Sequence, residues 1–538
     1  MPFDRATAIR RLADEEFDVL VVGGGITGTG VALDAVTRGL RTACIDKGDF
    51  ASGTSSKSSK LVHGGIRYLQ QKEVGLVYEA LAERQVLRKT APHLVHVLPF
   101  LLPVFTKDGL LPKKLSRLLG ATMWAYDFTG GLRIGKVHKR VKKDAALAFM
   151  PTLRADNVAA SYIYYDAQAD DARLTLTVAR TAADNGAALV NYAKLVEIDH
   201  DASGKARGAK VEVDGQQIDV RARTIVNATG VWSDEVHRVD DGSHEHTIRP
   251  AKGVHITVPW SLVKNEIAVV IPVPKDRRSV FVVPWGGENG PHEFTYIGTT
   301  DTDYDGPIED PQITPEDIEY LLRAINGATN ANITEADIVG TWAGLRPLVM
   351  SAKSERTADL SRRHSVKVST SGMISVTGGK LTTYRRMAAD AVDKVVDAVG
   401  RGGRSQTKHQ LLHGAKGWDA KGVPKELAER YGADAREIVT LERERPELAK
   451  LLIENLPYTR AEVVYAVRNE MARTIDDVLA RRTRARLLAR DASAIAADDV
   501  ADLMAAELGW SDEERAAQVA AYRALIDEER QAGDLLPQ

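Results

Sequence analysis

One stretch near the N-terminus limits the fold of this chain more than any other: FDVLVVGGGITGTGVALDAVTRGLRTACIDKGD, residues 17–49. Its unbroken apolar run VLVV is typical of a parallel strand that is buried on both faces. Gly23, Gly25 and Gly28 then follow the G-x-G-x-x-G spacing, which allows a tight turn, a close approach to pyrophosphate and close helix–strand packing. The helix start offers N–H groups to phosphate, and Asp46 is placed to bind a ribose. The stretch therefore predicts a dinucleotide-binding βαβ unit.

The turn alone does not distinguish NAD from FAD, and two later segments favour FAD. Residues 223–233, RTIVNATGVWS, are typical of a buried strand that ends at Thr229 and Gly230. Residues 372–396, GMISVTGGKLTTYRRMAADAVDKVV, predict a strand, a Gly-Gly turn and a helix. The N-terminus of that second helix could face the electron-rich edge of a reduced flavin.

A third segment, GTSSKSSKLVHGGIRYL (residues 53–69), is crowded with hydroxyl groups and glycines. Serine and threonine stabilise loops through local hydrogen bonds, which can account for each hydroxyl separately. That explanation leaves His63 and the cation Arg67 without a purpose. We therefore expect a ligand that needs small donors, close backbone approach and one positive charge.

Composition excludes several classes of protein. At 538 residues the chain is too long for one ordinary core, so two or three domains are expected. A net charge of −2 argues against a general nucleic-acid-binding role. The single cysteine, Cys44, cannot form an internal disulfide, and no signal peptide or membrane-spanning run is recognised, so a cytoplasmic protein is expected. No metal site is expected, since His244 and His246 lie in a charged loop without further ligands nearby.

The rest of the chain divides into a β-rich and a helical part. VHITVPW, SVFVVPWG and FTYIGTTD predict an antiparallel sheet, and Asp214-Gly215 predicts a type I′ hairpin turn. Beyond about residue 402 the sequence is rich in Ala, Glu and Arg with helical period. Signals of helix ends occur there as two capping boxes and a glycine stop: Thr459 with Glu462, Ser511 with Glu514, and Gly509.

Eight motifs, in their order along the chain, resemble those of aerobic-type, FAD-dependent glycerol-3-phosphate dehydrogenases. They are the glycine-rich turn of the first βαβ unit, SSKSSKLVHGGIRYL, NATGVWSD, KGVHITVP, VVPWG, IGTTDTDY, GLRPL and GGKLTTYRRMA. The resemblance runs from about residue 17 to 400 and more loosely beyond. It implies an α/β plus α+β protein with a glutathione-reductase-type FAD domain, an antiparallel-sheet substrate domain and an all-α C-terminal domain. The expected bounds are 17–92, 168–245 and 363–400 for the FAD domain, 93–167 and 246–362 for the substrate domain, and 401–538 for the helical domain.

The resemblance also implies which residues bind the cofactor. Those in the glycine-rich turn and the serine-rich segment would contact the pyrophosphate, ribose and ribityl chain, and those near residues 64 and 380 would contact the flavin ring. The implied set is Gly23, Gly25, Gly28, Asp46, Thr54, Ser55, Ser56, Ser58, Gly64, Gly65, Thr229, Gly230, Gly379, Leu381 and Thr382.

The implied reaction is oxidation of sn-glycerol 3-phosphate to dihydroxyacetone phosphate, with hydride passing from C2 to flavin N5. Arginine suits a phosphate monoester, and Arg67 with Tyr68 would face the phosphate, while Arg346 lines the site nearer the reacting carbon. The hydroxyl proton needs a base whose pKa lies near the working pH. His255 is one candidate, and Lys380 is a second, either as base or as a cation that stabilises developing charge.

Residues 100–143 contain ten Lys or Arg and two Asp, interleaved with apolar runs such as LPFLLPVF. Such a segment favours contact with an anionic membrane surface, although the apolar residues could equally form core. The family passes its electrons to a membrane quinone, so we expect a peripheral protein on the inner face of the cell membrane. A homodimer is one arrangement that the sequence leaves open.

Three alternatives remain at this stage. A glycerophosphate oxidase shares the same motifs and reduces O₂, but it generally carries an insertion for which this chain is too short. A more distant amino-acid-oxidase-like flavoenzyme would bind a carboxylate rather than a phosphate. A protein that binds FAD only for structure would show no reduction of its flavin by substrate.

Overall fold

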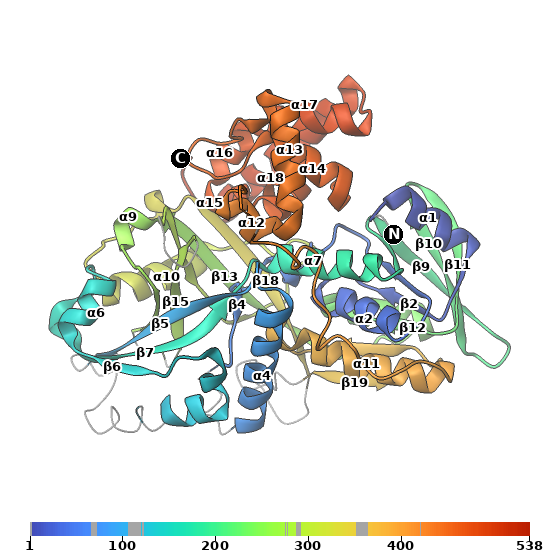
Figure 1. Ribbon diagram of the computed structural model, residues 1–538, viewed down its shortest axis with the longest axis horizontal. Helices are drawn as coiled ribbons and strands as arrows, with labels where there is room; N and C mark the ends of the chain where they lie inside the picture. Colours follow the sequence, from blue (N-terminus) through green and yellow to red (C-terminus); the bar gives the residue numbers. More distant parts are fainter. Residues whose placement is uncertain are drawn as a thin grey trace.

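The computed structural model describes residues 3–65, 73–105, 120, 123–274, 276, 278–286, 292–350, 364–419 and 421–537. These residues form three β-sheets and a helical C-terminal unit (Figure 1). The sheet that carries the glycine-rich turn lies on the right of the figure, the largest sheet on the left, and the C-terminal helices above both. The predicted fold class is confirmed.

The first sheet has six strands and is parallel except at one edge. Alternate residues of its strand β2 enter two different cores: Val19 and Val21 pack against helices, whereas Leu20 and Val22 face the opposite layer. Both faces are covered, which explains the unbroken apolar run. Its strands, in spatial order, are β19 (Ser365–Val368), β20 (Ile374–Thr377), β12 (Ile225–Asn227), β2 (Val19–Val22), β3 (Thr42–Ile45) and β8 (Ala188–Val190). The helices on one face are α2 (Ile26–Thr37), α7 (Asp171–Asp184) and α11 (Tyr384–Val399).

A four-stranded sheet covers the opposite face, together with α1 (Arg5–Asp14). It contains the predicted hairpin, in which Asp214 and Gly215 have φ values of 51° and 76°, the left-handed values that a type I′ turn requires. Its strands, in spatial order, are β1 (Glu16–Phe17), β11 (Gln216–Ala222), β10 (Ala206–Val213) and β9 (Ala193–His200).

The largest sheet confirms the predicted antiparallel pairing of the three β-rich segments, with one parallel pair between β5 and β14. Strand β4 also joins it, although β4 follows the serine-rich segment directly. Its strands are β17 (Thr302–Asp303), β13 (Ile248–Pro259), β16 (Phe294–Gly298), β15 (Ser279–Trp285), β14 (Ala268–Pro272), β5 (His96–Phe105), β7 (Val158–Gln168) and β4 (Leu61–Val62), with β18 (Gly340–Val349) on β13 and β6 (Lys139–Val141) on β7. Helices α6 (Lys143–Phe149) and α10 (Pro315–Ala328) cover one face, and α4 (Val74–Thr90) contributes to the core on the other. Two shorter helices are α8 (Ser233–Asp241) and α9 (Trp260–Val263).

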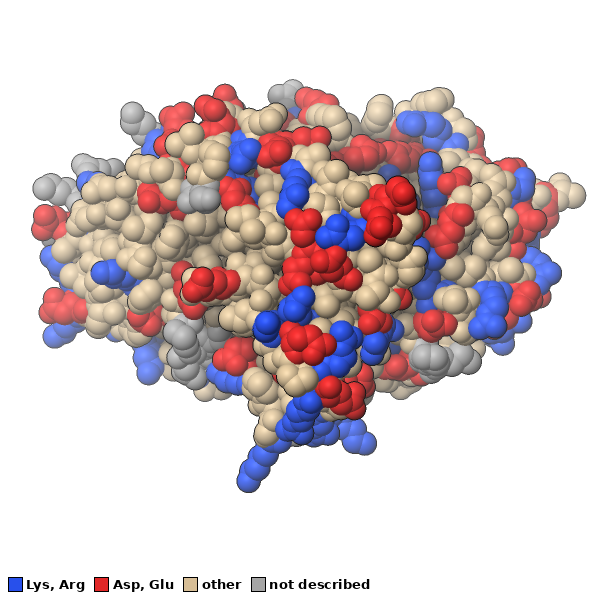
Figure 2. All heavy atoms as spheres, turned by 90° about the horizontal axis from the view of Figure 1, so that it is seen from above, with Lys and Arg blue, Asp and Glu red and all other residues tan. Residues whose placement is uncertain are grey.

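The C-terminal unit is helical and has its own core. Both predicted capping boxes and the glycine stop at Gly509 are present. Its helices are α12 (Lys425–Tyr431), α13 (Ala435–Glu444), α14 (Arg460–Glu470), a π-helical turn (Asp477–Arg482), α15 (Ala485–Leu488), α16 (Arg490–Ile495), α17 (Ala497–Leu508) and α18 (Asp512–Ala532). Figure 2 shows the molecule from above, from the side of the C-terminal helices. Acidic and basic side chains are interleaved on this face, so its described residues form no extended basic surface. None of the helices that the structure describes combines the length and the apolar character needed to cross a membrane.

His413 joins the C-terminal unit to α7, and it predicts a pH-dependent stability. Its Nδ1 lies 2.6 Å from a carboxylate oxygen of Asp184 and its Nε2 2.7 Å from one of Asp434. Burial lowers the pKa of His413, but hydrogen bonds to the two carboxylates outweigh burial and raise it to about 9.

Because this pKa lies above the unfolded value of 6.5, the protonated ring stabilises the fold fully below pH 6.5, and this contribution is lost as the pH rises through about 9. Urea unfolding should therefore show a loss of about 2 kcal/mol between pH 6.5 and 9 that His413→Gln lacks. Equal losses in both proteins would contradict this assignment.

Candidate functional site

Two glycines close the turn after β2. Gly23 has φ of 111°, and a Cβ there would come within 2.6 Å of the Ala228 carbonyl oxygen. A Cβ on Gly28 would come within 1.8 Å of the Gly23 carbonyl oxygen. Neither position accepts a side chain, so strand β2 and helix α2 can meet this closely only with glycine at both sites.

The start of α2 is open. Gly25 is its N-cap, and of the described residues only Ser55 comes within 4 Å of a Cβ position there. The N–H of Ile26 donates to Ser55 Oγ at 2.9 Å, whereas those of Gly25 and Thr27 have no acceptor in the described part of the chain. N–H groups at a helix start that lack acceptors form an anion site, and these fit the pyrophosphate of FAD.

Asp46 lies at the end of β3, beside this turn. Its carboxylate accepts the backbone N–H of Gly24 at 2.6 Å and that of Gly48 at 2.8 Å. Burial raises the pKa of Asp46 to about 6, and the two N–H donors only partly oppose this. Nearby, the ring of Trp232 lies against Gly53, and its buried indole N–H has no partner among the described residues. A carboxylate and an indole N–H in these positions suit ribose and phosphate oxygens.

Thr229 and Gly230 follow Ala228, the first residue after the end of β12. The Thr229 hydroxyl donates to Asn227 at 2.7 Å. Gly230 has φ of 62°, and none of the described residues comes within 4 Å of a Cβ position on it. Because a Cβ on Gly23 would come within 2.6 Å of the Ala228 carbonyl oxygen, this loop lies next to the glycine-rich turn.

The serine-rich segment lies on strand β18. Thr54 donates to the Leu345 carbonyl at 2.6 Å, and Gly344 leaves room for the Lys57 backbone, since a Cβ there would come within 2.6 Å of the Lys57 carbonyl oxygen. Ser56 is buried and its hydroxyl lies 3.4 Å from the Gly53 carbonyl. Several of the predicted FAD donors therefore hold the segment in place, and Ser55 is the one that lies at the helix start.

A buried ion-pair cluster anchors the same segment from behind. Asp171, at the start of α7, accepts from the Ser58 backbone N–H at 2.9 Å, the Ser58 hydroxyl at 2.7 Å and the Lys60 ammonium at 3.0 Å. Arg484, from the C-terminal unit, donates to Asp171, to Asp170 and to the Ser56 carbonyl. Burial, followed by repulsion from Arg484, lowers the pKa of Lys60 to about 8.

His255 lies on the face of the β13–β18 ladder that this segment covers. It is 2% exposed, its ring stacks on Trp342 with centroids 4.7 Å apart, and its Nε2 lies 2.9 Å from Ser59 Oγ. Its Nδ1 is buried without a partner in the described residues. Burial, and then the charges of Lys60 and Arg346, lower the pKa of His255 well below 6.5, so the ring is neutral near pH 7.

Arg346 extends from the same face of the ladder, opposite Ala251 in the register. Its guanidinium donates to Asp301 at 3.1 Å, to Thr299 Oγ1 at 3.1 Å, and to the backbone carbonyls of Lys252 and Thr300. A Cβ on Gly253 would come within 2.4 Å of this guanidinium, so glycine is needed there. The position of the planar guanidinium group of Arg346 is therefore fixed by at least four hydrogen-bond acceptors.

The segment after β4 meets the start of the second predicted helix. The His63 N–H donates to Thr382 Oγ1 at 3.1 Å, and the Gly64 N–H lies 3.2 Å from the Tyr126 hydroxyl. Gly65 and Gly379 have φ of 73° and 82°. Lys380 and Leu381, both half-buried, follow this turn. Residues 63–65 and 379–382 therefore converge from two distant parts of the sequence. Arg67 and Tyr68 lie outside the described residues.

Sequence reasoning missed three residues that support these groups: Asp171, Trp342 and Arg484. Arg484 and Asp171 are 313 positions apart, and a single sequence carries no signal that pairs them. Asp170 is the N-cap of α7, and the run DD at 170–171 is a signal of a helix start that could have drawn attention to Asp171. No group of three or more His, Cys, Asp or Glu with metal-binding geometry occurs among the described residues, and His244 and His246 are exposed.

Comparison with known proteins places this site in context. The family model described as FAD dependent oxidoreductase matches residues 18–385, and the C-terminal domain of alpha-glycerophosphate oxidase matches residues 399–515. The chain is 39% identical to the glycerol-3-phosphate dehydrogenase of Mycobacterium leprae, over 98% of this chain and 91% of that protein. It is similar to the structure of the Bacillus halodurans glycerol-3-phosphate dehydrogenase complexed with FAD, with a TM-score of 0.78, 30% identity, and coverage of 99% and 98%. The FAD-bound L-alpha-glycerophosphate oxidase of Mycoplasma pneumoniae shares the fold alone, with a TM-score of 0.56 and 16% identity over 73% of this chain and 97% of that one.

Proposed function

Because the chain belongs to the FAD-dependent oxidoreductases and, within them, to the glycerol-3-phosphate dehydrogenase family, we propose that it oxidises sn-glycerol 3-phosphate to dihydroxyacetone phosphate. The observation that carries this proposal is the convergence of segment 54–60 with the start of α2 on one side and with His255 on the other. The proposed dinucleotide site therefore lies at one end of this short segment, next to Ser55, and the neutral imidazole of His255 lies at the other end, next to Ser59.

When bound, FAD supplies the two-electron acceptor for the hydride that leaves C2 of the substrate. The chain must remove the hydroxyl proton, and we assign this to His255 Nδ1, the ring nitrogen that Ser59 does not engage. The lowered pKa of His255 keeps the ring neutral and therefore able to accept a proton at neutral pH. Stacking on Trp342 holds the plane of the ring.

Lys380 is the alternative base, and the pH dependence of the rate separates the two assignments. If His255 is the base, kcat/KM should rise with pH along a limb that lies below pH 6.5, and His255→Ala should lose this limb together with about 10²- to 10⁴-fold of kcat. Lys380→Ala should keep it. His200→Ala, which removes an exposed histidine of the outer sheet, is the matched control. A limb that survives in His255→Ala and disappears in Lys380→Ala would transfer the role to Lys380.

The substrate phosphate requires cations, and we propose that Arg346 supplies one near the reacting carbon. Its guanidinium is held in place by its acceptors within the protein, so it would supply a fixed positive charge without further loss of side-chain entropy on binding. Arg67 and Tyr68 are proposed to face the phosphate. Arg346→Lys keeps the positive charge but loses the planar guanidinium group. It should therefore raise KM for glycerol 3-phosphate while the FAD content of the protein changes little.

We propose a membrane quinone as the electron acceptor and an anionic membrane surface as its location. The structure describes part of the basic and apolar stretch of residues 100–143, and two aromatic residues within the described part support contact with lipid. Trp124 and Phe128 are 52% and 73% exposed, and their rings stack with centroids 5.6 Å apart. Exposed aromatic side chains of this kind favour the interface between lipid and water.

The double variant Trp124→Ser with Phe128→Ser should bind vesicles of anionic phospholipid about tenfold or more weakly. Two apolar side chains that would insert into the lipid are then lost from the contact. Co-sedimentation measures this. Ile495→Ser, which alters a residue 78% exposed on the C-terminal unit, is the control and should not change binding. An equal effect of Ile495→Ser, or none for the double variant, would contradict the location.

The function is tested by product analysis with several acceptors. The purified holoprotein should form dihydroxyacetone phosphate from sn-glycerol 3-phosphate when a soluble quinone analogue is present, and neither glycerol nor glycine should replace the substrate. Reoxidation of the reduced protein in a stopped-flow instrument should be much faster with the quinone analogue than with O₂. Fast reaction with O₂ would favour the oxidase, and turnover of glycine would favour an amino-acid-oxidase-like enzyme.

A further inference from the structure

A cavity of about 470 Å³ lies between the largest sheet, the start of α7 and the C-terminal helices. Residues of β15 and β16 form one wall, and α12 with residues 451–458 forms another. Its volume is in the range that binds small organic ligands. Its lining does not include His255, Arg346 or Lys380, the residues proposed to act on the substrate. Lys60 of the serine-rich segment lines it together with Tyr296, whose hydroxyl donates to the Ser59 carbonyl at 3.0 Å.

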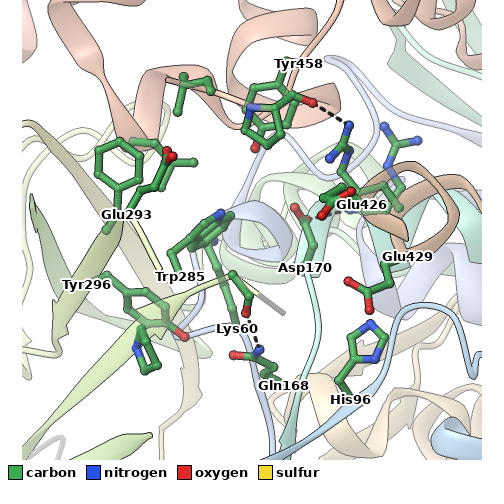
Figure 3. A pocket seen from close by; sticks show the side chains of 18 of the residues that line it. Lys60, His96, Gln168, Asp170, Trp285, Glu293, Tyr296, Glu426, Glu429 and Tyr458 are labelled. Atoms are coloured by element: carbon green, nitrogen blue, oxygen red, sulfur yellow. Dashed lines mark hydrogen bonds between the residues drawn. The ribbon is translucent and has the colours of Figure 1, made fainter. Parts of the chain in front are cut away.

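The two sides of the cavity differ in chemistry (Figure 3). Aromatic side chains lie on the left and at the top of the view: Trp285, Tyr296 and Tyr458. The carboxylates of Asp170, Glu426 and Glu429 lie on the right, and Glu293 lies at the left edge. An occupant would therefore meet apolar and aromatic surface on one side and hydrogen-bond acceptors on the other.

The cations that line the cavity already have partners. Arg173 donates to Glu470 and to the Arg482 carbonyl, and Arg430 to Glu462 at 2.7 Å and to the Pro457 carbonyl at 3.0 Å. The Lys60 ammonium is bound to the Ser56 carbonyl and Asp171. Lys425 is paired with Glu429 at 3.4 Å.

The acceptors are less completely satisfied. Glu426 and Glu293 are exposed, and no cation lies within ion-pair distance of either carboxylate in the described part of the chain. The side chain of Asp170 is held by Arg484 yet remains 23% exposed, and that of Glu429 is 18% exposed. The cavity thus combines two carboxylates that have no cation partner in the described part of the chain, those of Glu426 and Glu293, with aromatic faces, a pairing that attracts organic cations.

We propose that this cavity is a binding site for a small organic cation, an ammonium group carried on an apolar or aromatic body. The ammonium lies among Asp170, Glu426 and Glu429, and the body packs against Trp285, Tyr296 and Tyr458. An anionic ligand is disfavoured, because it would meet carboxylates while the neighbouring cations are already bound to other groups.

Isothermal titration of the FAD-loaded protein with 2-phenylethylammonium tests the proposal. The amine should bind in a saturable manner and at least about tenfold more tightly than 2-phenylethanol, since a charge-assisted hydrogen bond contributes more than a neutral one. The carboxylate analogue 3-phenylpropionate should bind most weakly. Equal affinity for amine and alcohol, tighter binding of the carboxylate, or no binding of the amine at millimolar concentration would each overturn it.

Variants locate the binding. Glu426→Gln with Glu429→Gln should weaken the amine about tenfold and leave the alcohol unchanged, whereas Trp285→Ala should weaken both. Glu528→Gln, an exposed carboxylate of α18 outside the cavity, is the matched control and should change neither. An amine affinity that is unchanged in both cavity variants would place the ligand elsewhere and overturn the assignment. None of these residues belongs to the proposed catalytic machinery, so FAD content and turnover serve as checks that each variant is folded.

Discussion

Gly25→Val is expected to weaken FAD binding by at least about 100-fold while leaving the fold intact. The φ of Gly25 is −76°, which valine accepts, and only Ser55 lies near the new Cβ, at 3.1 Å. The added side chain therefore causes no backbone strain but occupies the open space at the start of α2. Two lost hydrogen bonds to phosphate, at about 1.5–3 kcal/mol each, correspond to this change in affinity.

The measurement is the dissociation constant of FAD for the apoprotein, together with circular dichroism to establish folding. Gly75→Val is the matched control, because no described residue lies within 4 Å of a Cβ there and the residue sits in α4, away from the turn. A folded Gly25→Val protein that keeps its yellow colour through gel filtration would mean that the cofactor does not use this helix start.

Arg484→Ala is expected to destabilise the protein by about 3–5 kcal/mol, because it leaves Asp170 and Asp171 without their main cation. Asp171 is fully buried, and it holds both Ser58 and Lys60. The loss should therefore also loosen the serine-rich segment and increase the rate at which FAD dissociates. Urea unfolding gives the free energy, and the release of flavin fluorescence gives the rate.

Arg515→Ala provides the comparison, since Arg515 pairs with Asp502 and Asp498 on the surface of the C-terminal unit. Exposed pairs contribute about 0–1 kcal/mol, so this change should be small. Equal destabilisation by the two substitutions would contradict a special role for the buried cluster. A large loss of stability with an unchanged rate of FAD release would mean that the buried cluster does not influence FAD binding through the serine-rich segment.

Features of the fold that depend on neighbouring residues were predictable from the sequence. The βαβ unit, the hairpin at Asp214-Gly215 and the capping boxes are confirmed, because each rests on residues within one turn or one strand. The family resemblance and the FAD cofactor are confirmed by the comparisons, since long motifs in fixed order are specific.

Contacts between distant residues were not predictable. The chain pairs Ser59 with His255 and Arg484 with Asp171 across 196 and 313 positions, and nothing local in a single sequence marks either pair. The hydroxyls of Thr54 and Ser58 illustrate a related limit. Both were predicted to face FAD, and both form hydrogen bonds within the protein, because serine and threonine serve loops and ligands with the same atoms. The roles of the site residues stay predictions.

Anaerobic titration of the purified holoprotein with sn-glycerol 3-phosphate tests the central claim most directly. The structure predicts that the flavin absorbance is bleached, with one dihydroxyacetone phosphate formed for each FAD reduced, and that glycerol at the same concentration has no effect. A protein that is colourless and does not take up added FAD, or whose flavin stays oxidised in excess glycerol 3-phosphate, would contradict it.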